Sequence, residues 1–599
     1  MRGRRAAPSA CSGLAAAAVL AAAGTSADES RYDVLISGAT VYDGNGGAPF
    51  VGDVAISGER IAYVGPHASG TARERLDARG KAVAPGFINM LAHPEESLLI
   101  DGRALSDLRQ GVTLEVLGED SMGPLTPQMQ KLLKQRQGDI HYDVDWSTLG
   151  EYLHKLEQRG IAPNVASYVG AGTVRTYVLG ERDVQPNAAQ LEQMRTLVDQ
   201  AMEQGALGVT TALIYSPNDY ARTPELIALA SEAARCGGIY SAHMRSEGDR
   251  LLEAVQETVE ISRASGAPAE IYHLKVAGKR NWNKIDALIQ AVDAARKSGV
   301  HLTADMYVYT AGATGLDAAM PPWVQDGGLE AWIARLKQPQ TRARVLAEMR
   351  EPAPAWENLL GAAGSSGTLL LSFKNPKLKP LTGKTLAEVA RMRGESPEDA
   401  AIDLVIEDGS RVGVAYFLMS EDNVRREVAL PWVSFDSDEA APAPEGVFLK
   451  SNSHPRAYGN FARVLALYVR KEHDLTLQEA VRKLSALPAK TLSLSDRGML
   501  QAGKAADVVV FDPASIQDHA TYERPHQLAT GVEEVWVNGM RALRHGEPTG
   551  AASGRALHGR AWSGAPGGGC RATAAAWSWG DEPRGRTPQA GASRPTAGG

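Results

Sequence analysis

The middle of the chain alternates short apolar runs with amphipathic stretches, and this alternation predicts repeated strand–helix units. In "RLLEAVQETVEISRASG" the apolar residues recur three and four positions apart until Gly266, which is typical of a helix that ends at a glycine. The stretches "GIYSAHMRSE" and "AEIYHLKVAG" are rich in β-branched and aromatic residues and end in polar side chains. Units of this length favour a parallel sheet, open or closed into a barrel, whose chemistry gathers where the strands end.

Both ends of the chain have a different residue pattern from the middle. Residues 31–84 and the late segments "GKAADVVVFDP" and "VEEVWVNGMRAL" contain β-branched residues interrupted by turn-forming residues, which predicts short strands. We expect residues 31–84 and 490–550 to pair into one small β domain, with a larger domain at 85–489 between them. Residues 326–425 interrupt the strand–helix rhythm with helical stretches, so we expect an insertion there that covers the active site.

Composition narrows the class of protein. The chain has 599 residues, 44% of them hydrophobic and 22% charged, as expected for a folded protein that is too long for one compact core. Its net charge of -7 includes no basic block. This argues against nucleic acid and anionic membrane surfaces as partners.

The two terminal segments and the cysteines carry separate predictions. Residues 1–27 begin with several arginines, continue with a short apolar run and end in small residues. This is the pattern of a secretory signal peptide with its cleavage site. We therefore expect a periplasmic or secreted protein with no membrane attachment after cleavage. Residues 560–599 are of low complexity, which predicts disorder. Cys11, Cys236 and Cys570 indicate neither a disulfide framework nor a cysteine-based zinc site, and we expect Cys236 to pack beside a helix end.

Two histidines occupy the same position in neighbouring units. His243 and His273 each lie at the polar exit of a predicted strand, one strand–helix unit apart. In a barrel this places the two imidazoles side by side at one rim, where zinc would take nitrogen ligands together with carboxylate and water. The alternative interpretation is two unrelated histidines, one capping a helix and one in the core.

Carboxylates near other strand ends could complete such a site. Asp438 closes the strand-like run in "PWVSFDSDEA", where it could bind a metal or accept a proton from metal-bound water, and Asp436 is its rival. Glu119 and Asp120 follow another β-type run, and either could be the anionic metal ligand. A solvated turn is the alternative interpretation of that pair.

Further side chains near strand ends could hold an anionic substrate. They are Arg245, Lys275, Tyr307, Tyr309, His454 and Arg456. Arginine suits this task because its planar guanidinium can grip a carboxylate through two parallel hydrogen bonds. A surface or capping role is the alternative for each of them.

Several motifs in the same order resemble the D-aminoacylase branch of the amidohydrolase superfamily, whose members are N-acyl-D-amino-acid deacylases. They are "APGFINM", "HMRSEGDRLLEA", "IYHLK", "TADMYVYTAG", "SDEAA" and "HPRAYGNFARVL". The resemblance implies an α/β fold: a TIM-like (β/α)8 barrel, a small β-sandwich built from both chain ends, and a lid over residues 326–425.

The resemblance also implies roles for individual residues. His243 and His273 match the two zinc-binding histidines of the family, and Asp438 matches the aspartate that acts as general base. Lys275, Arg456 and one of the two tyrosines named above fall where family members hold the substrate carboxylate.

The chain departs from the family pattern at two places. The superfamily's His-x-His is Leu91-x-His93 here, and the cysteine that usually supplies the anionic zinc ligand is replaced by the turn holding Glu119 and Asp120. A carboxylate still suits zinc but admits Mn²⁺ or another hard divalent ion. We therefore expect one tightly bound ion, Zn²⁺ before Mn²⁺. His93 is open to three interpretations: an accessory ligand, a polar wall of the pocket or a packed core residue.

The activity expected from these observations is metal-dependent hydrolysis of the N-acyl amide bond of N-acyl-D-amino acids, with Asp438 as general base. One alternative keeps the fold but acts on dipeptides with a D-residue or on cyclic amides. Another is a non-catalytic exported binding protein on a decayed hydrolase barrel, favoured by Leu91 in place of a histidine. We expect a small-molecule substrate, an N-acyl amino acid or another small amide, and the sequence does not fix the oligomeric state.

Overall fold

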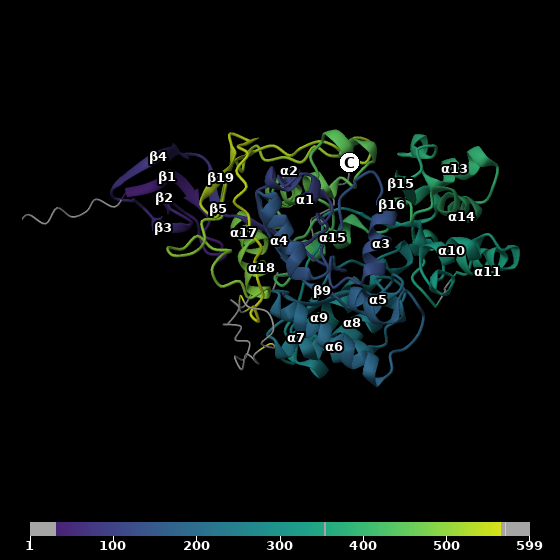
Figure 1. The fold of residues 1–599 in the computed structure, drawn as a ribbon. Helices are drawn as coiled ribbons and strands as arrows, with labels where there is room; N and C mark the ends of the chain where they lie inside the picture. Colours follow the sequence, from purple (N-terminus) through teal and green to yellow (C-terminus); the bar gives the residue numbers. More distant parts are fainter. Residues whose placement is uncertain (1–30, 353–354, 563, 565–569, 571–599) are drawn as a thin grey trace, which may run out of the picture.

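Strands from both ends of the chain pair in one nine-stranded sheet. β5 (Ala82–Pro85) pairs in parallel with β1 (Arg31–Val41) and antiparallel with β17 (Val508–Phe511). The strand order is β20-β19-β18-β17-β5-β1-β2-β3, with β4 beside β1. The other strands of this sheet are β2 (Phe50–Ser57), β3 (Arg60–Gly65), β4 (Thr71–Asp77), β18 (Val532–Val537), β19 (Met540–Arg544) and β20 (Glu547–Pro548). In the computed structural model this sheet lies at one end of the molecule, where purple and yellow segments meet (Figure 1).

A shared apolar cluster explains why the two chain ends pair. Val34 and Ile36 of β1 share one buried apolar cluster with Val508 and Val510 of β17. Residues two positions apart in a strand face the same side of a sheet, so these four side chains contribute to one shared apolar face. Neither chain end could bury that face alone, and their pairing removes it from water.

The middle of the chain forms parallel strands, ordered β6-β7-β8 in one sheet and β9-β10-β11-β12-β13 in another. Their bounds are β6 Phe87–Ala92, β7 Val112–Leu117, β8 Asn164–Ser167, β9 Val169–Gly170, β10 Gly208–Ala212, β11 Ile239–His243, β12 Ala269–Ile271 and β13 Leu302–Ala304. β8 and β9 are separated only by Tyr168.

The segment 433–438 connects the outer strands of these two sheets. The backbone N–H of Ser434 donates to the carbonyl of Ala304 on β13 at 2.8 Å, and the N–H of Asp438 donates to the carbonyl of Leu91 on β6 at 3.0 Å. This segment therefore lies between the first and the last parallel strand of the chain.

Helices pack outside the parallel strands, and Figure 1 shows α5 to α9 side by side along one edge. α8 (Leu251–Ser265) ends at Gly266, whose φ is 76°, which confirms the predicted helix end. The other helices before residue 300 are α1 (Ser97–Ile100), α2 (Leu105–Leu108), α3 (Pro127–Arg136), α4 (Leu149–Arg159), α5 (Ala171–Leu179), α6 (Ala188–Glu203), α7 (Thr223–Arg235) and α9 (Ile285–Lys297). Near the C-terminus they are α15 (Glu421–Val428), α16 (Arg456–Arg463), α17 (Leu477–Leu484) and α18 (Ala486–Thr491).

A third group of elements forms the teal end of the molecule in Figure 1. It contains an antiparallel sheet, ordered β14 (Ala311–Gly315), β16 (Gly413–Phe417) and β15 (Thr368–Ser372). Its helices are α10 (Leu329–Leu336), α11 (Pro339–Met349), α12 (Leu359–Ala363), α13 (Leu386–Arg393) and α14 (Pro397–Asp408). β14 precedes residue 326, so this sheet starts upstream of the predicted insertion.

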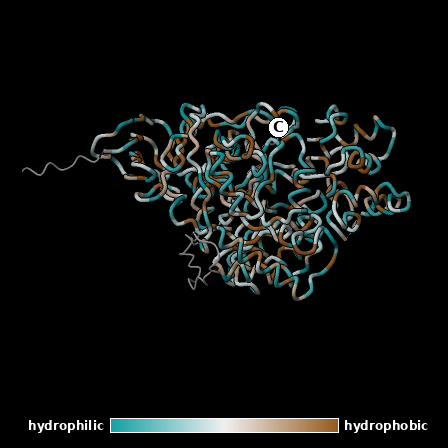
Figure 2. Tube along the Cα trace, in the orientation of Figure 1, coloured by the Kyte–Doolittle hydropathy of each residue, from teal (hydrophilic) through white to brown (hydrophobic). Residues whose placement is uncertain are grey.

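The structure describes residues 31–352, 355–562, 564 and 570. The predicted signal peptide at 1–27 and nearly all of the predicted disordered tail at 560–599 lie outside these residues. Among the residues described, no helix has the length and apolar character needed to cross a membrane. Along the trace in Figure 2, hydrophobic and hydrophilic positions alternate over short distances, as amphipathic elements require.

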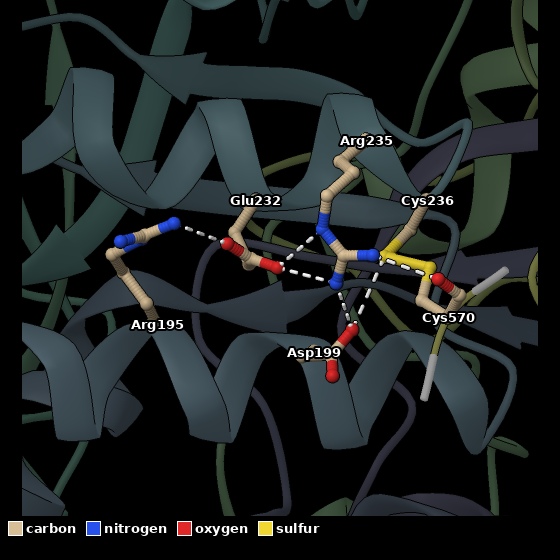
Figure 3. The surroundings of a disulfide bond; sticks show 6 residues. All are labelled: Arg195, Asp199, Glu232, Arg235, Cys236 and Cys570. Atoms are coloured by element: carbon tan, nitrogen blue, oxygen red, sulfur yellow. Dashed lines mark hydrogen bonds and ion pairs between the residues drawn. A yellow bond between two sulfur atoms is a disulfide. The ribbon is translucent and has the colours of Figure 1, made fainter. Parts of the chain in front are cut away.

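A disulfide links Cys236 to Cys570, with 5.5 Å between their Cα atoms (Figure 3). Cys236 follows the last residue of α7, which confirms its predicted place at a helix end. The expectation that the cysteines form no disulfide framework is wrong for this pair. Because 334 residues separate the two cysteines, no local spacing signals their pairing. Asp199 lies next to them, but with both sulfurs in the disulfide this cluster offers no thiolate to a metal.

Candidate metal centre

The carboxyl ends of the parallel strands bring the predicted metal-binding side chains together. His93 directly follows β6, Glu119 lies two residues after β7, His243 ends β11, and His273 lies two residues after β12. In parallel strands these ends meet at the same edge, so residues far apart in sequence converge there. The predicted strand around His273 is longer than the observed one, and His273 stands on the turn that follows it.

Glu119, His243 and His273 form a cluster that could hold a metal ion. One ligand atom from each lies within 4.8 Å of the others. Oε1 of Glu119 is 2.8 Å from Nδ1 of His243 and 3.1 Å from Nε2 of His273. The two imidazole rings meet edge to face with centroids 4.5 Å apart. Two neutral imidazoles and one carboxylate are a ligand set that catalytic zinc sites use, with a further position left open.

The backbone is strained at three residues of this region. Glu119, His273 and Asp438 have φ values of 66°, 36° and 47°, in the left-handed region that side chains with a Cβ rarely adopt. Such strain persists only where the surrounding structure holds it, and it clusters at functional sites. All three of these residues line the same cavity.

The structure separates the alternatives that the sequence left open. Asp120 is exposed and accepts a 3.4 Å hydrogen bond from Asn218, and it is not part of the three-residue cluster. Asp438 lines the cavity, whereas Asp436 is fully buried and does not line it. Burial raises the pKa of Glu119, but the hydrogen bonds and charges of His243 and His273 outweigh this and hold the pKa well below its usual range.

Asp438 lies between a histidine and an arginine. Its Oδ1 is 3.2 Å from Nε2 of His93, and its Oδ2 is 2.9 Å from Nη1 of Arg456. Burial raises the pKa of Asp438, but the charges of Arg456 and His273 and the hydrogen bond from His93 lower it to about 2. The carboxylate is therefore ionised at neutral pH and able to accept a proton.

Leu91 and His93 occupy different surroundings. Leu91 is fully buried in an apolar cluster with Val116 and Tyr272 and does not line the cavity. His93 lines the cavity, and its Nε2 is 3.9 Å from Oε2 of Glu119. The His93 ring therefore contributes a polar group to the cavity lining, 3.2 Å from Asp438.

The residues predicted to hold substrate divide into two groups. Lys275, Tyr307, His454 and Arg456 line the cavity, and the guanidinium of Arg456 lies 4.2 Å from the centroid of the Tyr307 ring.

The structure does not bring Arg245 and Tyr309 to this wall of the cavity. Arg245 is held by Glu257 at 2.9 Å and by backbone carbonyls. Tyr309 lies beneath the guanidinium of Arg463, with 5.0 Å to its ring centroid. Both residues follow strand ends in the sequence, but their side chains contact other neighbours and do not line the cavity.

Glu247 is a charged residue of the site that sequence reasoning missed. Its Oε1 lies 2.6 Å from Nζ of Lys275 and 3.0 Å from Nδ1 of His273. Burial raises the pKa of Glu247, but the charges of Lys275, His243 and His273 outweigh this and hold the pKa far below its usual range. The available signal was its spacing, four residues after His243 in "HMRSE".

A cavity of about 970 Å³ opens over the cluster. The opposite wall comes from the third group of elements, and the residues that line it include Thr314, Asp317, Trp332, Arg411 and Tyr416. Arg411 pairs with Asp317 at 2.7 Å and lies 5.0 Å from the ring centroid of Tyr215. The cavity is therefore polar at the cluster and on part of the facing wall.

The chain is similar to known proteins over most of its length. Residues 74–542 match the amidohydrolase family. The chain is 32% identical to a D-aminoacylase of Alcaligenes xylosoxydans xylosoxydans over 88% of its own length and 98% of the relative. It is also 32% identical to an N-acyl-D-glutamate deacylase of the same organism, over 87% of this chain and 96% of that one.

A solved structure extends the comparison to three dimensions. An N-acyl-D-glutamate deacylase from Bordetella bronchiseptica, complexed with zinc and a phosphonate inhibitor, superimposes with a TM-score of 0.73 at 29% identity. The match covers 88% of this chain and 100% of that one. The chain therefore belongs to the amidohydrolase family, in its D-aminoacylase branch.

Proposed function

We propose that this protein is a metal-dependent hydrolase that removes the acyl group from N-acyl-D-amino acids. The observation that carries the proposal is the convergence of Glu119, His243 and His273 at the floor of a large cavity, with Asp438 beside them. The relatives named above supply the substrate class, because they are a D-aminoacylase and a deacylase of N-acyl-D-glutamate.

The residues present fit a divalent ion. Glu119 Oε1, His243 Nδ1 and His273 Nε2 would hold it, and this set of one oxygen and two nitrogens suits Zn²⁺, with Mn²⁺ as an alternative. When bound, such an ion lowers the pKa of a water ligand toward neutrality and polarises a carbonyl oxygen. We propose one such ion, because Leu91 offers no ligand where a second histidine would stand.

Asp438 would accept the proton of the attacking water and return it to the leaving nitrogen. Its ionised carboxylate is available for this, but a carboxylate with a pKa of about 2 is a weak base. Much of the lowering comes from Arg456. A substrate carboxylate that shares Arg456 would reduce its effect on Asp438 and make Asp438 more basic once substrate is bound. Substrate binding and proton transfer by Asp438 would thus be coupled through the guanidinium of Arg456.

Arg456 has an N–H group available to donate a hydrogen bond to that carboxylate. Its side chain is 1% exposed, and its Nε has no hydrogen-bond partner among the described residues. A buried donor without a partner is costly, and an anionic ligand would satisfy it. Tyr307 packs against the same guanidinium and would orient it.

For the architecture, we propose a TIM-like barrel of eight parallel strands. The support is the hydrogen bonding of segment 433–438 to both β13 and β6, together with the near continuity of β8 and β9. The nine-stranded sheet would be the accompanying β-sandwich domain, built from the two chain ends. The elements of 326–425 that line the cavity would be the lid.

We also propose that the protein is exported. The signal-like pattern at 1–27 supports this, and so does the Cys236–Cys570 disulfide, because disulfides persist in oxidising compartments. N-terminal mass analysis of the protein from a periplasmic fraction tests it. An intact residue 1 on cytoplasmic material would refute export.

The activity is tested by measuring amine release from N-acetyl-D-amino acids, their L-enantiomers, a D-residue dipeptide and hydantoin. The proposal expects turnover of the D-acyl-amino acids to exceed that of the others. Faster turnover of the dipeptide or of the cyclic amide would show that this compound class, and not N-acyl-D-amino acids, is the substrate. A purified protein that takes up neither zinc nor manganese and hydrolyses none of these compounds would instead be a binding protein.

A further inference from the structure

Glu247 reaches the outward-facing nitrogens of both histidines of the candidate metal cluster. Its Oε1 is 3.0 Å from Nδ1 of His273, and its Oε2 is 3.9 Å from Nε2 of His243. These are the ring atoms turned away from Glu119, which lies on Nε2 of His273 and Nδ1 of His243. One carboxylate therefore stands behind two imidazoles whose other nitrogens face the same point.

Hydrogen-bond chemistry requires an acceptor at this place. A neutral imidazole that binds a metal through one nitrogen carries its proton on the other. Lys275 Nζ also lies 2.7 Å from Nδ1 of His273, but an ammonium group has no lone pair to accept that proton. If Lys275 donated to Nδ1 instead, the ring proton would sit on Nε2 and block it. Glu247 prevents this, because it accepts from Lys275 at 2.6 Å and can accept from His273.

The second imidazole shows the same need. Nε2 of His243 is buried and has no hydrogen-bond partner among the described residues. Oε2 of Glu247 lies 3.9 Å from this nitrogen. A shift of less than an ångström would close the present 3.9 Å to a hydrogen bond.

Charge gives Glu247 a further effect. The ammonium of Lys275 is buried beside a ligand of the proposed cation, and two positive charges at short range repel each other strongly in a poorly solvated site. The carboxylate of Glu247, itself 6% exposed, neutralises Lys275. Without it, the site would carry an uncompensated positive charge next to the metal position.

We propose that Glu247 is a positioning residue that fixes the ring protons of His243 and His273 on their outward nitrogens and so prepares both rings to bind the metal. This rests on the proposed metal-dependent function. It assigns to Glu247 an effect on metal affinity that is separate from contact with substrate.

The experiment measures Zn²⁺ affinity of the full chain by competition with a chromogenic chelator, for wild type, Glu247→Gln, Glu247→Asp and Glu357→Gln. Glutamine keeps the shape of Glu247 but loses the negative charge and one of the two acceptor oxygens. We expect Glu247→Gln to weaken zinc binding about 10–100-fold, the range found for partners of metal-binding histidines. Glu247→Asp, which keeps the charge on a shorter stem, should recover part of this loss.

Glu357→Gln is the matched control. Glu357 accepts a 2.7 Å hydrogen bond from Ser246 and a 3.2 Å bond from the backbone N–H of Glu247, so it supports the same loop without touching either histidine. Its zinc affinity should stay within about threefold of wild type. Metal-free melting temperatures of all four proteins check that each variant is folded, and Glu247→Gln should melt below the control because it breaks the buried pair with Lys275.

The outcomes separate the inference from the proposed function. Zinc binding by Glu247→Gln as tight as by wild type overturns the inference while leaving the metal site intact. An equal loss in Glu357→Gln also overturns it, because the effect would then come from the loop. Absence of zinc binding by wild type overturns the proposed function itself.

Discussion

Replacing Asp438 by asparagine removes the proposed base while keeping the shape of the side chain. Removal of a general base slows turnover by about 10²–10⁴-fold, which corresponds to about 3–5 kcal/mol of transition-state stabilisation. The same change breaks the pair with Arg456, a residue only 1% exposed. Losing one partner of a buried pair costs about 3–5 kcal/mol of stability, but the asparagine oxygen and the backbone carbonyl of residue 438 still accept from Arg456. We therefore expect a stability loss of about 1–3 kcal/mol, as for a weakened hydrogen bond.

The assay compares kcat for N-acetyl-D-amino acids, bound zinc and melting temperature between wild type and Asp438→Asn. Asp436→Asn is the matched control, because Asp436 lies two residues earlier but does not line the cavity. We expect Asp436→Asn to retain kcat within about tenfold. If Asp438→Asn, with a full zinc complement, turned over within tenfold of wild type, the assignment of Asp438 as base would be refuted.

Three further predictions concern Glu119, Glu270 and Cys236. Glu119→Gln should lose bound zinc while Asp120→Asn keeps it, because only Glu119 contacts both histidines; equal zinc contents, measured by elemental analysis, would contradict this. Burial raises the pKa of Glu270 from 4.5 to about 8, so the folded protein binds a proton that the unfolded chain releases, and stability should fall as pH rises between these values. The urea midpoint of Glu270→Gln should therefore fall less from pH 5 to pH 8 than that of wild type, and parallel declines would refute this. Cys236→Ser should leave kcat within about twofold of wild type, because Cys236 precedes β11 and lies at the strand end opposite the site; a tenfold loss in the same turnover assay would contradict it.

The local elements could be predicted from the sequence because their signals are local. The apolar spacing of 251–265 and the glycine after it place α8 within one residue, since helix periodicity and a left-handed cap act over neighbouring positions. The same reasoning placed His243 at a strand end. It failed for the strand before His273, which ends early because the backbone turns into the left-handed region at His273 itself.

The partners of individual side chains could not be predicted in this way. Arg245 and Glu247 both follow β11, yet Arg245 is held by Glu257 on α8 while Glu247 lies among the histidines. The choice between them depends on which way the chain turns after the strand. Likewise, Glu119 and Asp120 are adjacent acids in one turn, and only the backbone conformation at Glu119 aims one of them at the site.

The sequence by itself determined the alternation of strands and helices, the β-rich character of both ends and the residue types available for metal chemistry, because each depends on composition and spacing over a few positions. Only the tertiary structure decided which of these residues meet. The contact of Glu119 with His273, the pairing of β5 with β17 and the disulfide between Cys236 and Cys570 each join segments more than a hundred residues apart. Such contacts form because packing buries apolar faces, and that requirement is satisfied by the whole chain rather than by any stretch of it.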